Sequence, residues 1–169
     1  MDGEAYDLVI VGGGLVGGSL ACALRGSGLR VCSVEAIAAD ADSQPSYDER
    51  VIALSWGSRR VLEGIGLWGD LGPGAEPIHK IHVSERGAFG FAHLDDAEQG
   101  VTALGFVAPA RLLGTAIRGA LADAPDIAAL CPARLLGFSS GPDEVVLDVA
   151  VQGEARRLTA RLLVAADGG

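Results

Sequence analysis

Near its beginning the chain reads DLVIVGGGLVGGSLACALRGSGLRVCSVE over residues 7–35. The β-branched, apolar run 7–11 predicts a strand, glycines 12–14 predict a turn, and residues 15–25 predict a helix. After a second glycine-containing turn, residues 30–35 predict another strand. A β-α-β unit this short implies two parallel strands joined by a right-handed crossover, and therefore a sheet covered by helices.

A G-x-G-x-x-G motif spans the first turn and the start of the helix, with the residues Gly12, Gly13, Gly14, Leu15, Val16 and Gly17. Glycine meets three needs in such a motif: a tight turn, close approach of the backbone to a pyrophosphate, and close packing of helix on strand. The helix N-terminus adds N–H groups and the positive end of a dipole, both of which favour phosphate. The motif therefore predicts a dinucleotide with its pyrophosphate over residues 12–17.

Glu35 ends the second strand, 23 residues after Gly12. A carboxylate at this distance is where a ribose-binding acid belongs. Two ribose hydroxyls can donate to one carboxylate, whereas a 2′-phosphate would be repelled by it, so NADP is disfavoured at this site. Ala36, which follows, is included in the same predicted site. The pattern alone fits FAD and NAD equally.

Beyond a polar loop at 36–48, the pattern predicts two more helices, an antiparallel hairpin and a β-meander. The expected elements are a helix at 55–66, hairpin strands at 78–85 and 88–94, a strand at 103–107, a helix at 112–121, a strand at 126–130, and meander strands at 145–151 and 158–164. The hairpin and the strand at 103–107 are expected to begin a substrate-binding sheet. Phe89, Phe91 and Phe106 there suit an apolar ring and tail, although core packing explains them equally well.

Charge and hydropathy exclude several classes of protein. The chain has 22 acidic and 13 basic residues, a net charge of -9, so no basic surface is expected for nucleic acid. The acidic start argues against reading residues 8–24 as a signal peptide, and no run approaches the roughly 20 apolar residues of a membrane helix. The three cysteines are widely spaced and odd in number, which predicts no disulfide framework. We therefore expect a soluble, cytoplasmic protein.

The histidines predict no metal site. His79 and His82 are three residues apart in a predicted strand, so they face opposite sides and cannot chelate one ion. His93 lies on another segment, without a cluster of carboxylates. No G-x-S-x-G nucleophile elbow occurs either, so no Ser-His-Asp triad is expected.

Four separated motifs carry a family resemblance. They are Arg50-Val51-Ile52-Ala53-Leu54, Gly66-Leu67-Trp68, Ile81-His82-Val83-Ser84-Glu85-Arg86-Gly87 and Leu163-Val164-Ala165-Ala166-Asp167-Gly168. Their order resembles the 2-polyprenyl-6-methoxyphenol hydroxylase family of ubiquinone biosynthesis, within the para-hydroxybenzoate hydroxylase superfamily of FAD-dependent monooxygenases. The resemblance covers essentially the whole chain.

The resemblance implies an α/β, Rossmann-like FAD-binding fold of the GR2 type, with a parallel sheet, a β-meander and the beginning of an antiparallel substrate-binding sheet. Residues 1–77 would form the FAD-binding β-α-β core and 78–107 the first strands of the substrate-binding sheet. Residues 108–169 would complete the FAD-binding domain with the meander and a DG motif. The C-terminal half of the full protein is expected to be absent, and these 169 residues alone are expected to be inactive.

The resemblance also implies which residues bind the cofactor. The glycine motif and Glu35 would hold the ADP half of FAD, and Arg50 would lie near its flavin side. Asp167 and Gly168 form the DG motif, which the superfamily associates with FAD and with the reducing nicotinamide nucleotide. Arg111, at the start of a helix, is a further expected FAD contact, although residues 108–110 depart from the commoner polar pattern.

The implied activity is hydroxylation of a prenylated aromatic ring, with molecular oxygen as co-substrate and NAD(P)H as reductant. The cofactor performs the hard step, so no catalytic side chain is assigned. A polyprenyl phenol would bring the enzyme peripherally to the inner membrane face. Two other classes stay open at this point: a flavin- or NAD-dependent reductase on the same fold, and a non-catalytic nucleotide-binding fragment.

Overall fold

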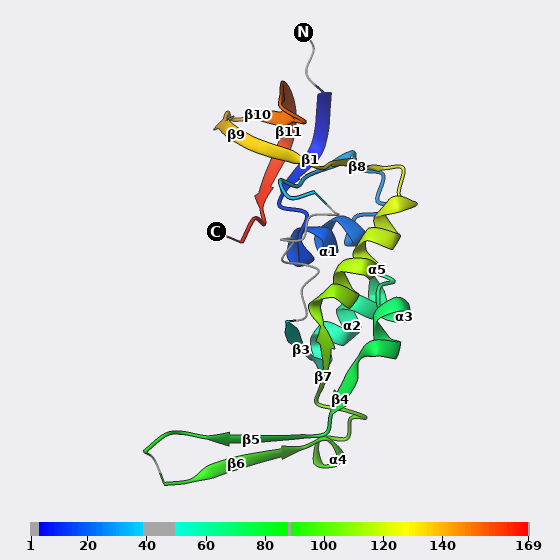
Figure 1. The fold of residues 1–169 in the computed structure, drawn as a ribbon, viewed down its shortest axis with the longest axis vertical. Helices are drawn as coiled ribbons and strands as arrows, with labels where there is room; N and C mark the ends of the chain where they lie inside the picture. The colour runs from blue at the N-terminus through cyan, green and yellow to red at the C-terminus, as the bar shows by residue number, and fades with distance from the viewer. Residues whose placement is uncertain (1–3, 39–49, 88, 169) are drawn as a thin grey trace. The chain divides into compact units, whose positions relative to one another are not determined.

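The computed structural model describes residues 4–38, 50–87 and 89–168, and the chain forms two compact units. The first, here called the mixed-sheet unit, comprises Met1–Asp48 and Gly114–Gly169. The second, here called the hairpin unit, comprises Glu49–Leu113. Figure 1 labels the helices and strands of both units. Positions 39–48 of the predicted loop lie outside the described residues.

A six-stranded sheet forms the centre of the mixed-sheet unit, in the order β8-β2-β1-β11-β10-β9. Its strands are β1 (Glu4–Val11), β2 (Val31–Val34), β8 (Ile127–Leu130), β9 (Ala133–Ser140), β10 (Val145–Val151) and β11 (Glu154–Ala165). The four strands β8, β2, β1 and β11 are parallel, and β11, β10 and β9 continue as an antiparallel meander. The predicted parallel sheet and β-meander are therefore confirmed, with β9 as a meander strand that the pattern did not predict.

The centre of this sheet is buried on both faces. On one face Val9 packs with residues of β2, β10 and β11, and on the other Ile10 packs with Ala21 of helix α1 (Leu15–Ala23) and with Ile127. Both Val9 and Ile10 are fully buried. Burying each such side chain contributes about 1.5–3 kcal/mol, which explains why an uninterrupted apolar run forms this strand.

The hairpin unit contains two antiparallel sheets. One has the order β3-β7-β4 and the other is the β5-β6 hairpin. The elements of this unit are β3 (Val51–Ser55), α2 (Trp56–Gly64), α3 (Trp68–Leu71), η2 (Gly72–Gly74), β4 (Glu76–Ile78), β5 (Lys80–Ser84), β6 (Phe91–Asp95), α4 (Asp96–Gln99) and β7 (Gly105–Pro109). Helix α5 (Ala110–Ala122) begins in this unit and continues into the mixed-sheet unit.

The single strand predicted at 78–85 is wrong. The structure divides it at His79 into β4 and β5, which belong to different sheets. Adjacent carbonyl groups bond to different segments at this point. Ile78 O accepts a hydrogen bond from Leu104 N, and His79 O accepts one from Asp96 N. Residue types 78–85 are those of one strand, and only these distant partners separate it into two.

Aromatic packing organises the rest of the hairpin unit. Ser55 caps α2 by accepting a hydrogen bond from Ser58 N at 3.1 Å, close to the predicted helix start. The Arg59 guanidinium lies 5.0 Å from the ring centre of Trp56 and 5.5 Å from that of Trp68. Phe106 of β7 packs edge-on against Trp68, with ring centres 4.8 Å apart. Trp68 therefore anchors the segment after α2.

Candidate functional site

The carboxyl ends of the four parallel strands bring the main predicted site residues together. The glycine turn 12–17 follows β1, Glu35 follows β2, and Asp167-Gly168 follows β11. β8 ends beside them at Leu130, followed by Cys131. Ligands of open α/β sheets bind outside this edge, so the strand order itself defines a candidate site.

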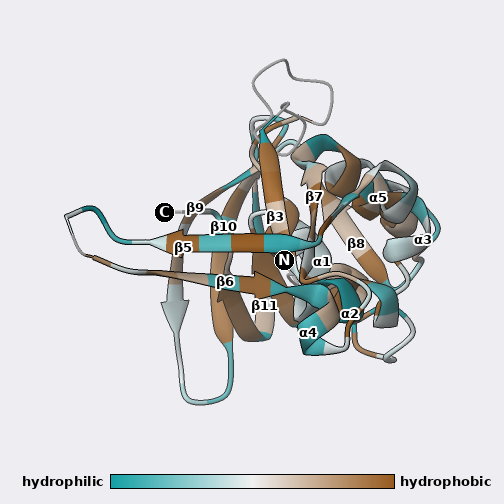
Figure 2. Cartoon of the chain, turned by 90° about the horizontal axis from the view of Figure 1, so that it is seen from below, coloured by the Kyte–Doolittle hydropathy of each residue, from teal (hydrophilic) through white to brown (hydrophobic). Residues whose placement is uncertain are grey.

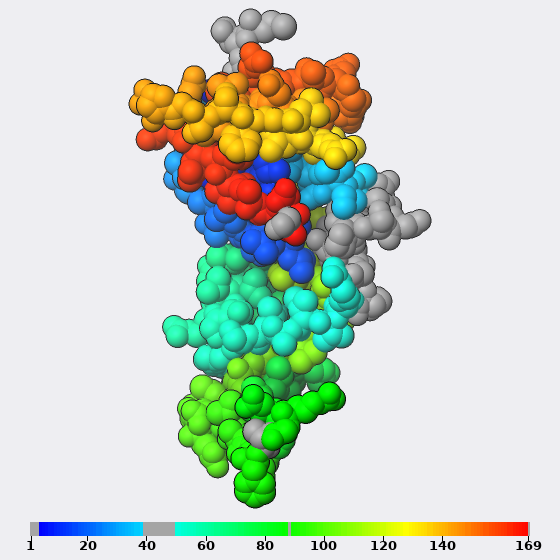
Figure 3. All heavy atoms as spheres, turned by 90° about the vertical axis from the view of Figure 1, so that its left-hand side faces the viewer, coloured from blue at the N-terminus to red at the C-terminus, as the bar shows by residue number. Residues whose placement is uncertain are grey.

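The first glycine of the turn lies directly against the DG motif. Val11 is in register with Ala165 in the parallel β1-β11 pair, and Ala166 N donates to Val11 O at 2.7 Å. A Cβ at Gly12 would lie 2.5 Å from the carbonyl carbon of Ala166 and 2.7 Å from Asp167 N, and the φ of Gly12 is +100°. Only glycine fits both constraints. Figure 3 shows the red end of β11 against the blue N-terminal segment.

Two further glycines set helix α1 close to its neighbours. A Cβ at Gly17 would overlap the carbonyl oxygen of Gly12 and lie 3.0 Å from Ile10 Cγ2. A Cβ at Gly18 would lie 2.6 Å from Ile117 Cγ2 of α5. Gly14 is the N-cap of α1, and no side-chain hydrogen bond caps this helix among the described residues. The first turn of α1 therefore presents backbone N–H groups and its positive dipole end to a ligand.

The Glu35 carboxylate is held by two backbone groups. Its Oε2 accepts from Gly13 N at 2.7 Å, and its Oε1 accepts from Ile37 N at 2.7 Å. Glu35 is half-buried. An ionised carboxylate has about four acceptor sites, so these two bonds fix its position and leave acceptors for two hydroxyls. The position of Glu35 at the end of β2 was predicted, whereas its hydrogen bond to the glycine turn was not.

A cavity of about 320 Å³ opens beside Glu35. Its lining residues come from the glycine turn, β2, α5 and the end of β8. They include Gly13, Ser33, Ile117, Arg118, Leu130 and Cys131. The cavity is largely apolar and could accept a flat ring next to a ribose bound at Glu35. Of its lining, the sequence had indicated only the glycine and Glu35. The predicted strand at 126–130 was a usable signal, because its carboxyl end had to reach the same sheet edge.

Three other predicted site residues are placed less directly. Ala36 is exposed next to Glu35. Arg50 and Arg111 are exposed residues of the hairpin unit, where Ala110 N donates to Arg50 O at 2.8 Å and the two arginines flank the β3-β7 pair. Their contact with a cofactor stays a prediction.

The three cysteines are free thiols. Cys22 and Cys32 are buried, and burial raises the pKa of both thiols, that of Cys32 to about 11. They are therefore neutral core side chains. Cys131 is exposed, and its thiol donates to Ile37 O at 3.3 Å.

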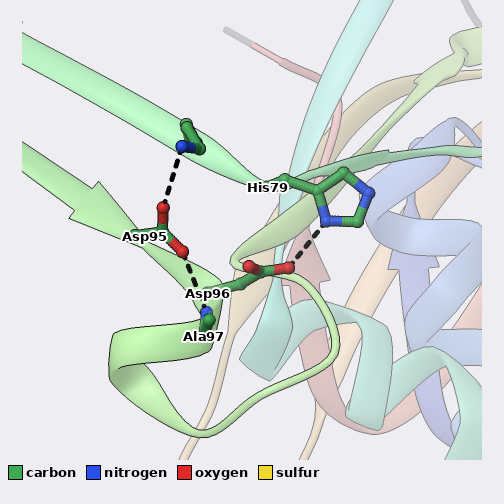
Figure 4. Close-up of polar contacts among 5 residues, drawn as sticks. His79, Asp95, Asp96 and Ala97 are labelled. Carbon is green, nitrogen blue, oxygen red and sulfur yellow. Dashed lines mark hydrogen bonds and ion pairs between the residues drawn. The ribbon is translucent and has the colours of Figure 1, made fainter.

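The histidines have partners that the sequence did not reveal. His79 Nδ1 lies 2.6 Å from Asp96 Oδ2, and the neighbouring carboxylate of Asp95 accepts a hydrogen bond from Ala97 N (Figure 4). His82 faces His93 across the hairpin. Within residues 4–38, 50–87 and 89–168, no group of three or more His, Cys, Asp or Glu side chains is placed to hold a metal ion.

Residues 5–169 match the family model described as FAD binding domain, and the chain belongs to this family. The fold and the glycine-carboxylate site thus define an FAD-binding domain. The chain is 39% identical over 166 residues to ubiquinone hydroxylase UbiL of Rhodospirillum rubrum, covering 98% of this chain and 38% of that protein. It is 32% identical over 173 residues to 3-demethoxyubiquinol 3-hydroxylase of Escherichia coli, covering 99% of this chain and 42% of that protein.

Among solved structures, p-nitrophenol 4-monooxygenase PnpA from Pseudomonas putida aligns with a TM-score of 0.80 at 21% identity, covering 98% of this chain and 42% of that one. This likeness establishes the fold. The resemblance to the ubiquinone-biosynthesis hydroxylases is confirmed by the curated relatives, of whose length the chain spans about two fifths. In the described part of the chain, no helix has the length and apolarity needed to cross a membrane.

Proposed function

We propose that this chain is the FAD-binding part of a flavin-dependent hydroxylase that acts on a polyprenyl phenol in ubiquinone biosynthesis. The observation that carries the FAD assignment is the placement of Glu35, whose carboxylate is fixed beside the glycine turn and lines the 320 Å³ cavity. The names of the curated relatives support a hydroxylase over a reductase.

Different residues bind different parts of FAD. Residues 12–17 and the first turn of α1 bind the pyrophosphate, and Glu35 accepts the hydroxyls of the adenosine ribose. The cavity lined by Glu35, α5 and the end of β8 receives the adenine ring, and Ala36 follows Glu35 in the chain. Arg50 lies near the flavin side of FAD, Arg111 is a further FAD contact, and the Asp167-Gly168 motif serves both FAD and the nicotinamide nucleotide. When bound, FAD supplies the oxygen-activating chemistry, and the protein supplies position and exclusion of water.

The rest of the proposed reaction rests on the family resemblance and on the names of the curated relatives. The substrate is a small aromatic molecule with a prenyl tail, molecular oxygen is the second substrate, and NAD(P)H is the reductant. Because such a tail partitions into lipid, the enzyme meets its substrate peripherally at the inner membrane face. A hydroxylase consumes oxygen in proportion to product formed, whereas a reductase on this fold consumes none, so oxygen uptake with a phenol distinguishes them.

Replacing Glu35 tests the ribose assignment. Glu35→Ala should weaken FAD by about 1 to 3 kcal/mol, roughly 5- to 150-fold, because hydrogen bonds to a charged acceptor are lost. FAD binding is measured by quenching of flavin fluorescence, with ADP as competitor. The matched control is Asp126→Ala, because Asp126 Oδ2 also accepts a glycine N–H, that of Gly26 at 2.7 Å, away from the cavity.

The control should bind FAD as the unmodified chain does. Equal losses in both variants would mean that Glu35 acts only by bracing the backbone, and no loss in Glu35→Ala would remove the ribose assignment. Gly14→Val should abolish flavin binding, because a side chain would stand where the phosphates approach the N-cap of α1. Full flavin occupancy in Gly14→Val would contradict the proposed site.

A further inference from the structure

Two of the chain's three histidines face one another across the β5-β6 hairpin. His82 and His93 are direct partners in the antiparallel register. His82 Nδ1 and His93 Nε2 lie 2.7 Å apart, and the ring centres are 4.8 Å apart. At this distance one ring nitrogen donates a hydrogen bond to the other.

A third ring orders this pair from one side. Phe91 lies on the same face of the hairpin as His93, two residues away, and its ring centre is 4.9 Å from that of His93 and 5.6 Å from that of His82. Both histidines are exposed. The pair therefore packs against one aromatic ring, and both of its side chains lie at the surface of this chain.

We propose that His82 and His93 bind a late first-row divalent cation, of the class of Zn²⁺, Ni²⁺ and Cu²⁺, in place of the hydrogen bond between their rings. Imidazole nitrogen is a preferred ligand of these ions. Zinc–nitrogen bonds are about 2.0–2.1 Å, so two nitrogens on one tetrahedral ion lie about 3.3 Å apart. The existing pair has to open by about 0.6 Å, which small rotations of two exposed side chains provide.

The neighbouring charges define how many protein ligands this ion has. Asp95 lies two residues beyond His93 on the same face, but its Oδ2 pairs with Lys80 Nζ at 3.2 Å and its Oδ1 accepts from Ala97 N at 3.1 Å. His79 is engaged by Asp96. The protein therefore contributes two nitrogens, and water completes the coordination shell. Such an ion is exchangeable.

A cation at this place would join β5 to β6. A two-stranded hairpin is marginally stable by itself, and in this chain, which spans about two fifths of its curated relatives' length, Val83 and Phe91 keep 52% and 70% of their surfaces exposed. Burial within this chain therefore does little to hold these strands together. An ion that binds the paired histidines and not the separated strands stabilises the paired state by mass action. The proposed ion thus links β5 to β6, and its ligands are not residues of the nucleotide site.

Zinc titration of the protein tests the proposal, by calorimetry and by NMR of the histidine ring nitrogens. We expect one Zn²⁺ per chain, with shifts at His82 Nδ1 and His93 Nε2 and none at His79. His82→Gln and His93→Gln should each weaken binding at least as much as loss of an outer-shell partner does, roughly 10- to 100-fold. His79→Gln is the matched control and should bind as the unmodified protein does.

Both substitutions replace exposed side chains, so the variants are expected to fold. Circular dichroism and FAD binding check that each variant is folded. Zinc affinity that is unchanged in both His82→Gln and His93→Gln would overturn the proposal, as would ring-nitrogen shifts confined to His79. Absence of zinc binding to the folded, unmodified protein would overturn it as well.

Discussion

Strand β1 and the β5-β6 hairpin are built from similar residue types but are stabilised differently. In β1, Val9 and Ile10 are fully buried, with neighbours on both faces of the sheet. In the hairpin, apolar and polar residues alternate along β5, as Figure 2 shows, and Val83 and Leu94 remain 52% and 41% exposed. β-branched and aromatic residues therefore specify a strand, whereas burial depends on what the rest of the chain places against it.

The largest expected difference between the two regions concerns deletion of core atoms. Ile10→Ala should lower the free energy of unfolding by about 2–5 kcal/mol, because it leaves a cavity between the sheet and α1. Its control, Val83→Ala in the hairpin, should change it by about 0.5 kcal/mol or less. Urea denaturation followed by far-ultraviolet circular dichroism measures both. Similar losses in the two variants would refute the contrast in burial.

Glycine substitution gives the next largest effect. Gly17→Ala should cost about 1–3 kcal/mol of stability and reduce FAD binding, because the new Cβ would press on Gly12 O and Ile10. Gly64, in α2, has no atom within 4 Å of an added Cβ. Gly64→Ala should therefore stabilise the chain by about 0.4–1 kcal/mol. If Gly17→Ala were as stable as Gly64→Ala, the close approach of α1 to the turn would be wrong.

The smallest expected effect concerns the polar pairs of the hairpin. The side-chain hydrogen bond from Lys80 is the main cause that lowers the pKa of Asp95, and the bond from Ala97 N adds to it. Because the folded pKa is below the unfolded one, this pair stabilises the fold above the unfolded pKa and is lost as the pH falls through the folded pKa. Lys80→Met should raise the pKa of Asp95 toward its usual range in an NMR titration. An unchanged pKa would remove Lys80 as its cause.

The local sequence pattern was enough to predict the elements that are specified by their own residue periodicity. The β1-turn-α1-β2 unit, helix α2 and the meander strands β10 and β11 follow from periodicity and glycine, whereas the third meander strand, β9, was not predicted. The glycine turn and Glu35 also follow, because they belong to one short segment. Strand β3 was not predicted, since its stability comes from Val107 and its neighbours in β7, about fifty residues away.

What the pattern missed depends on neighbours in space. The cavity beside Glu35 exists because β8 pairs with β2 and α5 packs against α1 through Ile117 and Gly18. The His82-His93 pair depends on hairpin register, which residue types do not specify. The division of the chain at 77/78 and 107/108, and the roles of Arg50 and Arg111, stay predictions.

The packing of Arg59 between Trp56 and Trp68 has a spectroscopic consequence. These are the chain's two tryptophans, and both belong to the hairpin unit, with Phe106 against them. Indole emission therefore reports on residues 49–113 alone, whereas far-ultraviolet circular dichroism reports on both units. In a single denaturation experiment the two signals separate when the units melt independently and coincide when they melt as one. The protein thus carries an intrinsic fluorescent label for one of its two units.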